Sequence, residues 1–228
     1  VLTAVGDAIW THKLSTNTDA GLQSLFDVMR SSDIAFLNFE QVMADHGYPS
    51  PKEVVRADPS IVDELVWAGT DIISIANNHM MDFGPSGLET TLRTLDDKGI
   101  KDAGAGADLT QALRATVIER NGLKVALLAL MVAPNFTDLG APAGQSAPGA
   151  APIRGSNIRL KDGHPAIAPW DVDLHAMEDA IREAKKSADV VLVSFHIHWG
   201  DPKNVDPDGK RLVAQSAIDA GTDIILGH

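Results

Sequence analysis

The 228-residue sequence has no cysteine, which excludes disulfides and any metal site built on thiolates. It also has no uninterrupted apolar run near the ~20 residues that a membrane helix needs, so we expect no transmembrane segment in this chain. The first residues, VLTAVGD, lack the basic and apolar regions of a signal peptide. We therefore expect a soluble chain, either cytoplasmic or extracytoplasmic after loss of a leader or anchor. Any metal would be bound by nitrogen and oxygen atoms of His, Asp, Glu and Asn.

Basic residues are few, since 19 Lys and Arg stand against 31 Asp and Glu, for a formal net charge of -12. A surface that binds nucleic acid without sequence preference needs an excess of basic side chains to neutralise phosphates. We therefore expect no nucleic-acid partner. If the chain binds a phosphate group, a local feature such as a pair of divalent ions would have to attract it.

The sequence repeats one order of elements: a helical pattern, a short turn, an aspartate and an apolar run. The instances are VMRSSDIAFLNFE, LVWAGTDIISIANNH, AKKSADVVLVSFHIH and AIDAGTDIILGH. Helices that alternate with apolar, β-rich runs predict βαβ units and a mostly parallel sheet. Asn121-Gly122, between two strand-like runs, predicts a hairpin and therefore a mixed sheet. The fold class expected is α/β.

We expect a single domain over residues 1–228. Its helices should begin at Asp58-Pro59, at Gly84-Pro85, and at Asp171 or Asp173. Between Val132 and Trp170, roughly forty residues rich in Ala, Pro and Gly show no clear period, which is long for a passive connection. This stretch, at about 132–170, is expected to be a lid, a specificity loop or an insert.

Five predicted strands end in side chains that can bind a metal through nitrogen or oxygen. These are Asp7 after LTAVG, Glu40 after IAFLNF, Asn78 and His79 after IISIAN, His196 and His198 at the end of VVLVSF, and His228 after IILG. Ligands of open α/β sheets bind at the carboxyl ends of the strands. Each residue alone has an ordinary alternative, such as a turn, a cap or a hydrogen-bonded structural histidine. Taken together, these residues favour a metal-binding site.

The set suits a hydrolytic centre with two divalent ions. Such ions lie about 3.5–4 Å apart and need a bridging carboxylate, separate ligands and a water that can attack. Glu40 could bridge, Asp7 would belong to one ion, and Asn78 with His228 and either His196 or His198 would belong to the other. The expected metal is Mn, Zn or Fe.

His79 would then be free to act as the general acid. Asp82, three residues further along the chain, could orient the imidazole of His79. A capping role or a solvated position is the alternative for Asp82.

Several motifs, in this order, resemble those of the CapA family, which is named for poly-γ-glutamate capsule biosynthesis. They are Gly6-Asp7, Asn38-Phe39-Glu40, Ala76-Asn77-Asn78-His79 with Asp82-Phe83-Gly84, Gly104-Ala105-Gly106, His198-Trp199-Gly200 and Gly227-His228. That family is similar to the calcineurin-like metallophosphatases. The resemblance implies a β-sandwich flanked by helices, in which Asn78 coordinates a metal and His79 protonates the substrate. Asn77 would shape the turn.

The chain departs from the family pattern in three places. It stops at His228, where the family continues through further histidines, so we expect it to be truncated at its C-terminus. The usual single His before Trp-Gly is a pair, which leaves His196 and His198 as alternative ligands. His12 stands where family members commonly carry Arg, so it could bind substrate or metal, or be an exposed loop residue. Trp199 could line a substrate pocket or simply pack.

The leading hypothesis is a CapA-like, metal-dependent hydrolase in which a metal-bridging hydroxide attacks a phosphoester, an amide or a γ-glutamyl bond. Its substrate would be a small molecule or a poly-γ-glutamate-like polymer. A second hypothesis is a non-catalytic subunit that binds the polymer or other capsule-synthesis proteins. A third is a di-iron redox enzyme, because a set of His and carboxylate ligands does not by itself select one metal.

Overall fold

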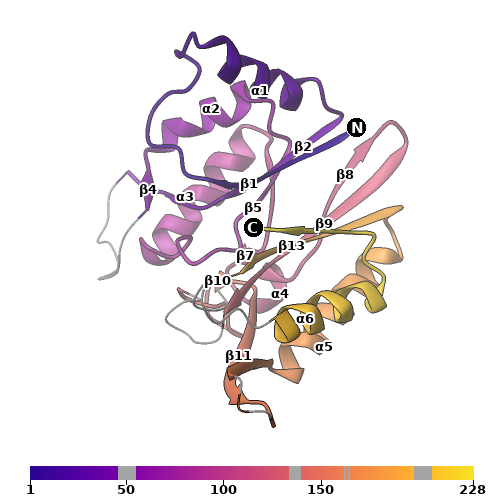
Figure 1. Cartoon of the computed structure of the whole chain (residues 1–228). Helices are drawn as coiled ribbons and strands as arrows, with labels where there is room; N and C mark the ends of the chain where they lie inside the picture. Colours follow the sequence, from indigo (N-terminus) through magenta and orange to yellow (C-terminus); the bar gives the residue numbers. More distant parts are fainter. Residues whose placement is uncertain (46–54, 134–139, 162, 164, 198–206) are drawn as a thin grey trace.

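The computed structural model describes residues 1–45, 55–133, 140–161, 163, 165–197 and 207–228 (Figure 1). The helices are α1 (Ala20–Arg30), α2 (Val62–Trp67), α3 (Gly84–Asp97), α4 (Leu109–Ala112), α5 (Asp171–Lys185) and α6 (Pro207–Ala220), with a 3-10 turn at Pro59–Ile61. The first sheet is parallel, in the order β1 (Leu2–Ala8), β2 (Ile34–Phe39), β5 (Ile72–Ser74) and β6 (Lys101–Ala103). The second runs β12 (Pro165–Pro169), β11 (Pro152–Arg159), β9 (Leu123–Ala133), β13 (Val190–Ile197) and β14 (Ile224–Gly227), with β8 (Thr116–Arg120) also paired to β9. Two short pairs join β3 (Val42–Met43) to β4 (Arg56–Ala57), and β7 (Ala105–Gly106) to β10 (Gly149–Ala150).

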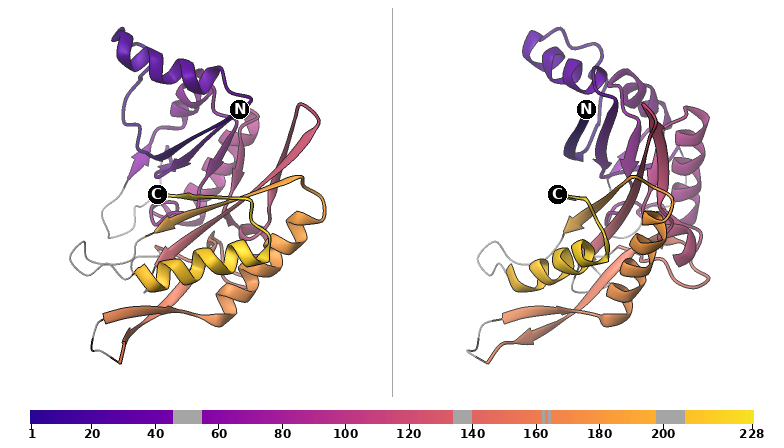
Figure 2. Two further views of the ribbon diagram at one scale, coloured as in Figure 1. Left: turned by 45° about the vertical axis from the view of Figure 1, so that its right-hand side comes forward. Right: turned by 90° about the vertical axis from the view of Figure 1, so that its right-hand side faces the viewer.

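The two sheets pack face to face and helices cover their outer faces. Phe36 and Ile72 of the first sheet share one buried cluster with Leu127 and Leu192 of the second. Helices α1 to α3 pack on the outer face of the first sheet, and α5 and α6 on that of the second (Figure 1). The first and last strands come to the same side of the molecule (Figure 2). The predicted α/β class, with mixed sheets in a sandwich flanked by helices, is therefore confirmed.

The hairpin is present, because β8 and β9 are antiparallel and its turn residues Asn121 and Gly122 have φ of 54° and 77°, as a type I′ turn requires. Helices α3 and α5 begin at Gly84 and Asp171, while the segment after Asp58 starts with a 3-10 turn.

The stretch from Val132 to Trp170 contains more regular structure than its composition predicts. Strand β11 pairs in parallel with β9 and in antiparallel fashion with β12, so much of the stretch extends the second sheet. The composition shows no clear period, whereas these strands give the stretch regular structure. Residues 134–139 lie outside the described part of the chain.

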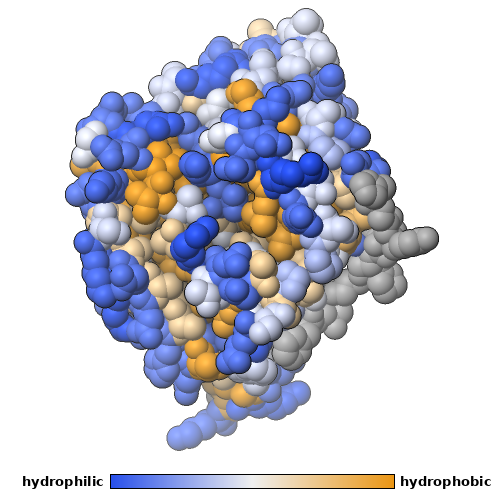
Figure 3. Space-filling model, turned by 180° about the vertical axis from the view of Figure 1, so that it is seen from behind, coloured by the Kyte–Doolittle hydropathy of each residue, from blue (hydrophilic) through white to orange (hydrophobic). Residues whose placement is uncertain are grey.

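Seen from behind, the surface of the molecule is mostly hydrophilic, with apolar side chains in smaller areas between polar ones (Figure 3). Among the described residues, no helix combines the length and the apolar character that crossing a membrane requires.

Gly104 lies where the chain passes between the two sheets. A Cβ at this position would lie 2.5 Å from Cβ of Ala76 and 2.8 Å from the carbonyl oxygen of Ala129, and its φ is +101°. We expect Gly104→Ala to lower the free energy of unfolding by about 2–4 kcal/mol, through overpacking and backbone strain. Gly122→Ala is the matched control, since its φ is +77° but a Cβ there meets nothing within 4 Å. Chemical denaturation should show the larger loss for Gly104→Ala, and equal losses would contradict this account.

Asp102 makes the stability depend on pH. Burial is the main influence and raises the pKa of Asp102 to about 6, although Arg114 and Lys101 oppose it. The folded-state pKa of Asp102 lies above that of an unfolded aspartate. The contribution of Asp102 to the free energy of unfolding is therefore most favourable below about pH 4 and is lost as the pH rises through about 6. The asparagine of Asp102→Asn does not ionise. We therefore expect its free energy of unfolding, relative to that of the wild type, to rise by up to about 3 kcal/mol between pH 4 and pH 8. Denaturation curves at both pH values test this, and a constant difference would contradict it.

Candidate metal centre

Side chains alternate between the two faces of a strand. At the carboxyl ends of the strands, this alternation places polar side chains between the two sheets. Along β2, Ile34 and Phe36 point into the core that the two sheets share. Asn38 follows on the same face by the period of two, and Glu40 comes two residues later. The same face that packs the two sheets together therefore becomes polar where β2 ends.

The last two strands of the second sheet show the same change. On β13, Leu192 packs in the core between the sheets, and Ser194 and His196 continue its face. On β14, Leu226 packs against that core and His228 follows two residues later. The main chain of His228 continues the pairing, because its N–H donates to the carbonyl of Phe195 (3.1 Å).

A β-bulge brings Asp7 onto this face. In the pairing of β1 with β2, Ala4 lies opposite Phe36 and Asp7 opposite Asn38, so three residues of β1 match two of β2. Without the extra residue, the side chain of Asp7 would point toward the helices, because successive side chains alternate between faces. The shift places Asp7 opposite Asn38, facing the second sheet.

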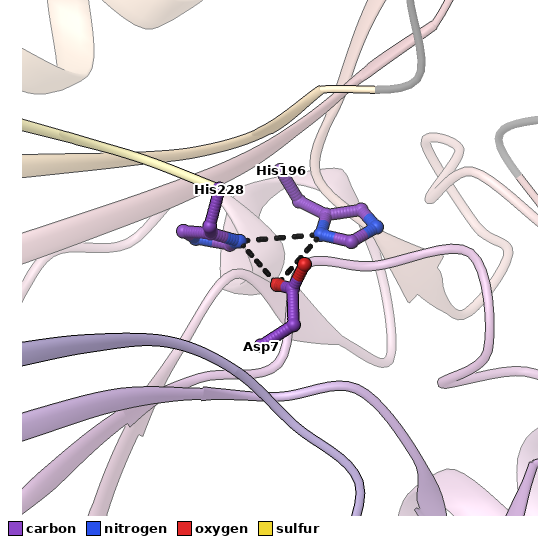
Figure 4. A group of neighbouring side chains, drawn as sticks. All are labelled: Asp7, His196 and His228. Atoms are coloured by element: carbon purple, nitrogen blue, oxygen red, sulfur yellow. Dashed lines mark hydrogen bonds and ion pairs between the residues drawn. The ribbon is translucent and has the colours of Figure 1, made fainter.

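Asp7, His196 and His228 form the centre of the site. Their potential ligand atoms lie within 4.8 Å of one another. Nδ1 of His228 is 2.8 Å from Oδ1 of Asp7, and Nδ1 of His196 is 3.3 Å from the same oxygen. Figure 4 shows the carboxylate of Asp7 pointing at both imidazole rings. A carboxylate and two imidazoles are a donor set that Mn, Fe and Zn accept.

Glu40 and Asn78 lie on the other edge of the His196 ring. Nε2 of His196 is 3.1 Å from Oδ1 of Asn78 and 3.4 Å from Oε1 of Glu40. Burial raises the pKa of Glu40, and the nearby negative charge of Asp7 raises it further, although His79 opposes this. The two carboxylates therefore repel each other, and a cation near both would relieve this repulsion.

The protonation states suit metal binding. Burial alone would raise the pKa of Asp7, but the hydrogen bond from Asn38 and the neighbouring imidazoles outweigh it and lower this pKa. Burial lowers the pKa of His228, and Asp7 only partly offsets this. An ionised aspartate and a neutral histidine are the forms that act as ligands.

The imidazole of His79 is held by the carboxylate of Asp82. Nδ1 of His79 is 2.8 Å from Oδ2 of Asp82, which also accepts the main-chain N–H of Val55 (2.8 Å). The side chain of Asp82 is 4 % exposed and that of His79 is 16 % exposed, so the ring is held from the interior and reaches the surface.

The other predicted site residues have different positions. His12 is exposed, hydrogen bonds with its neighbour Thr11, and is not part of the group of potential ligands found among the described residues. His198 and Trp199 lie outside the described residues. The sequence predicts that Asp7 and His228 bind different ions, but His228 lies against Asp7, so these two residues would share an ion.

Two further buried residues contact the potential ligands Asp7 and His228, and the sequence predicts no site role for them. Asn38 donates to Oδ1 of Asp7 (2.7 Å), and the hydroxyl of Ser194 is 2.8 Å from Nε2 of His228. Period-two spacing is the signal that could have found them, because Asn38 precedes Glu40, and Ser194 precedes His196, by two positions.

Ser194 would orient His228 toward an ion. The hydroxyl of Ser194 is 2.8 Å from Nε2 of His228, so with Nδ1 bound to an ion it would accept the hydrogen bond from Nε2–H and fix the ring. We expect Ser194→Ala to weaken Mn²⁺ binding about 10–100-fold, as is usual for residues that support a ligand. Isothermal titration calorimetry can measure this, with the exposed Ser187→Ala as control. Equal affinities for both variants would show that Ser194 does not support the ligand.

The structure thus defines a mixed α/β protein with a nitrogen- and oxygen-based candidate metal centre between two sheets. Residues 1–228 match the family described as "Bacterial capsule synthesis protein PGA_cap". The chain belongs to this family of bacterial capsule synthesis proteins.

Curated relatives agree with this assignment, and a solved structure shares the fold. The chain is 30% identical to "PGA biosynthesis protein CapA" of Bacillus subtilis, over 98% of this chain and 55% of the relative. It is 27% identical to "Capsule biosynthesis protein CapA" of Bacillus anthracis, over 100% of this chain and 53% of the relative. It therefore spans about half the length of these curated relatives. The crystal structure of a hypothetical protein from Thermus thermophilus shares the fold, with a TM-score of 0.50 and 16% identity over 99% of this chain and 66% of that one.

Proposed function

We propose that this chain carries a dinuclear, metal-dependent hydrolytic centre that serves capsule polymer biosynthesis. The observation that carries the proposal is the convergence of Asp7, Glu40, Asn78, His196 and His228 between the two sheets. Asp7, His196 and His228 would hold one ion, and Glu40 and Asn78 would hold its neighbour. Bound Mn, Zn or Fe would supply an acidified water and polarise the bond to be cleaved.

The protein's own contribution to the chemical step is a positioned proton. His79 would give a proton to the leaving group from Nε2 while Asp82 holds Nδ1. The negative charge of Asp82 also stabilises the protonated imidazole, so the ring can regain a proton after each turnover.

The substrate class proposed is a γ-glutamyl or other amide bond, or a phosphoester, in a small molecule or in a poly-γ-glutamate-like polymer. The name of the Bacillus subtilis relative, "PGA biosynthesis protein CapA", supports a role in making such a polymer. Cleavage would then trim or release a polymer chain, or process a phosphorylated precursor.

The direct test is hydrolysis of three chromogenic substrates: p-nitrophenyl phosphate, bis(p-nitrophenyl) phosphate and γ-glutamyl-p-nitroanilide. We expect the Mn²⁺-loaded chain to cleave at least one of them. A chelator should abolish this activity and added Mn²⁺ should restore it. Equal rates with and without the chelator would contradict the proposal.

The second candidate is a subunit that binds the polymer or other capsule-synthesis proteins without chemistry. Its support is that both CapA relatives are named for biosynthesis and are about twice as long as the matched region. Failure of the metal-loaded chain to cleave any of the three substrates would favour this candidate.

A further inference from the structure

Asp102 on β6 carries a half-buried carboxyl group that no other side chain holds. In the first sheet it lies opposite Ile73, which packs toward the helices, while the next residue, Ala103, packs between the two sheets. Because side chains alternate along a strand, the Asp102 side chain lies on the face that α3 covers. Within the part of the chain that the structure describes, no hydrogen bond or ion pair reaches this carboxyl group.

The unpartnered carboxyl group has a cost for the folded state. Burial raises its pKa to about 6, so at neutral pH the chain keeps a charge in a place that disfavours it. An asparagine would fit the same space without that charge. Groups that lower stability and have no structural partner are typical of binding sites, where a ligand supplies the missing partner.

The Asp102 side chain borders a cavity of about 250 Å³. Leu92 and Asp96 of α3 form one wall, and Gln111, Arg114 and Thr116 form another. The volume lies below the range of about 300–1,000 Å³ that is usual for drug-sized ligands, so the cavity suits a smaller molecule. None of the residues that line it belongs to the proposed metal centre.

Arg114 brings the opposite charge to the same cavity. Its charge lowers the pKa of Asp102, but the two side chains form no ion pair, and the described residues offer the Arg114 guanidinium no other partner. A guanidinium can bind a carboxylate through two parallel hydrogen bonds, and a carboxylate can bind an ammonium group. Asp96 adds a second negative charge to the lining, which disfavours a ligand that carries acid groups alone.

We propose that this cavity binds an α-amino acid group, with the ammonium at Asp102 and the α-carboxylate at Arg114. Two sources share this chemistry. One is a free amino acid, and the other is the amino-terminal residue of a γ-linked glutamyl chain, which keeps both its α-ammonium and its α-carboxylate. The site does not rest on the proposed function, because binding here involves no hydrolytic step and no metal ligand.

The test is an NMR titration of the full, ¹⁵N-labelled chain at about pH 7.5, where most of the Asp102 carboxyl group is ionised. With L-alanine as the probe, we expect the main-chain amide signals of Gly104, Gly106 and Gln111 to shift and to saturate. N-acetyl-L-alanine lacks the ammonium group and ethylamine lacks the carboxylate, so both should bind at least about 10-fold more weakly. No shift at these residues, or equal affinity for all three compounds, would overturn the proposal.

Two variants remove one charge each from the cavity. Asp102→Asn and Arg114→Gln should each weaken L-alanine binding about 10–100-fold, since each loses a charge-assisted hydrogen bond. Both should stay folded, because the first removes an unpaired interior charge and the second changes an exposed side chain. Asp97→Asn and Arg211→Gln are the matched controls, as both residues are exposed and lie outside the cavity lining. Unchanged affinity in Asp102→Asn or in Arg114→Gln would overturn the proposal.

Two further probes distinguish the sources of the amino acid group. Tighter binding of γ-L-glutamyl-L-glutamate than of L-glutamate would support a chain end as the ligand, and the reverse would support a free amino acid. Binding is measured without metal and without turnover. A chain that binds L-alanine as expected but cleaves none of the chromogenic substrates would therefore keep this site and reject the proposed function.

Discussion

Replacing His79 by alanine should lower kcat by about 10²–10⁴-fold, the usual effect of losing a general acid, while the metal content stays unchanged. The reason is the position of the ring, which is held through Nδ1 by Asp82 (2.8 Å) and is not one of the three residues that form the ligand group. Steady-state kinetics and elemental analysis of the same preparation would measure both quantities.

The matched control is His175→Ala, which removes an exposed histidine from α5. It should change neither kcat nor metal content. Loss of metal in His79→Ala would contradict the assignment of His79 as acid, because it would make this residue a ligand. Asp82→Asn should show a smaller loss of kcat than His79→Ala, since the imidazole remains but is oriented less well.

The second large effect is expected for Asp7→Asn, which keeps the shape of the side chain and can still accept the hydrogen bond from Asn38. It removes the negative charge that faces His196 and His228. In the wild type, Mn²⁺ at about 100 times its Kd should add about 2.7 kcal/mol to the free energy of unfolding. Asp7→Asn should lose most of this stabilisation, and differential scanning calorimetry with and without Mn²⁺ can measure the loss.

Asp27→Asn serves as the control for Asp7→Asn. Asp27 is an exposed carboxylate on α1 that pairs with Arg30 (2.7 Å), away from the ligand group. Its variant should respond to Mn²⁺ as the wild type does. An undiminished response of Asp7→Asn would show that Asp7 binds no ion.

Much of the fold could be predicted because its signals are local. The turn at Asn121-Gly122 requires positive φ at both residues, and these two residue types adopt it readily. The alternation of helical patterns with apolar runs predicts parallel strands, and the carboxyl ends of parallel strands meet at one edge. For this reason, Asp7, Glu40, Asn78, His196 and His228 could be selected together from the sequence.

The remaining features depend on contacts between distant segments. The bulge that turns Asp7 toward the second sheet depends on the register between β1 and β2, which no single strand encodes. Ser194 interrupts an apolar run and resembles an ordinary buried serine until β14 places His228 beside it. Strands β11 and β12 are formed by a stretch rich in Ala, Pro and Gly, whose β-structure comes from pairing with β9 and with each other.

The central claim is that the residues between the two sheets bind a pair of divalent ions. Inductively coupled plasma mass spectrometry of the purified, unchelated protein tests it, beside the double variant Glu40→Ala, Asn78→Ala. We expect about two ions of Mn, Zn or Fe per chain in the wild type and a clear loss in the double variant. A wild-type protein that contains no metal and takes up none on reconstitution would contradict the claim.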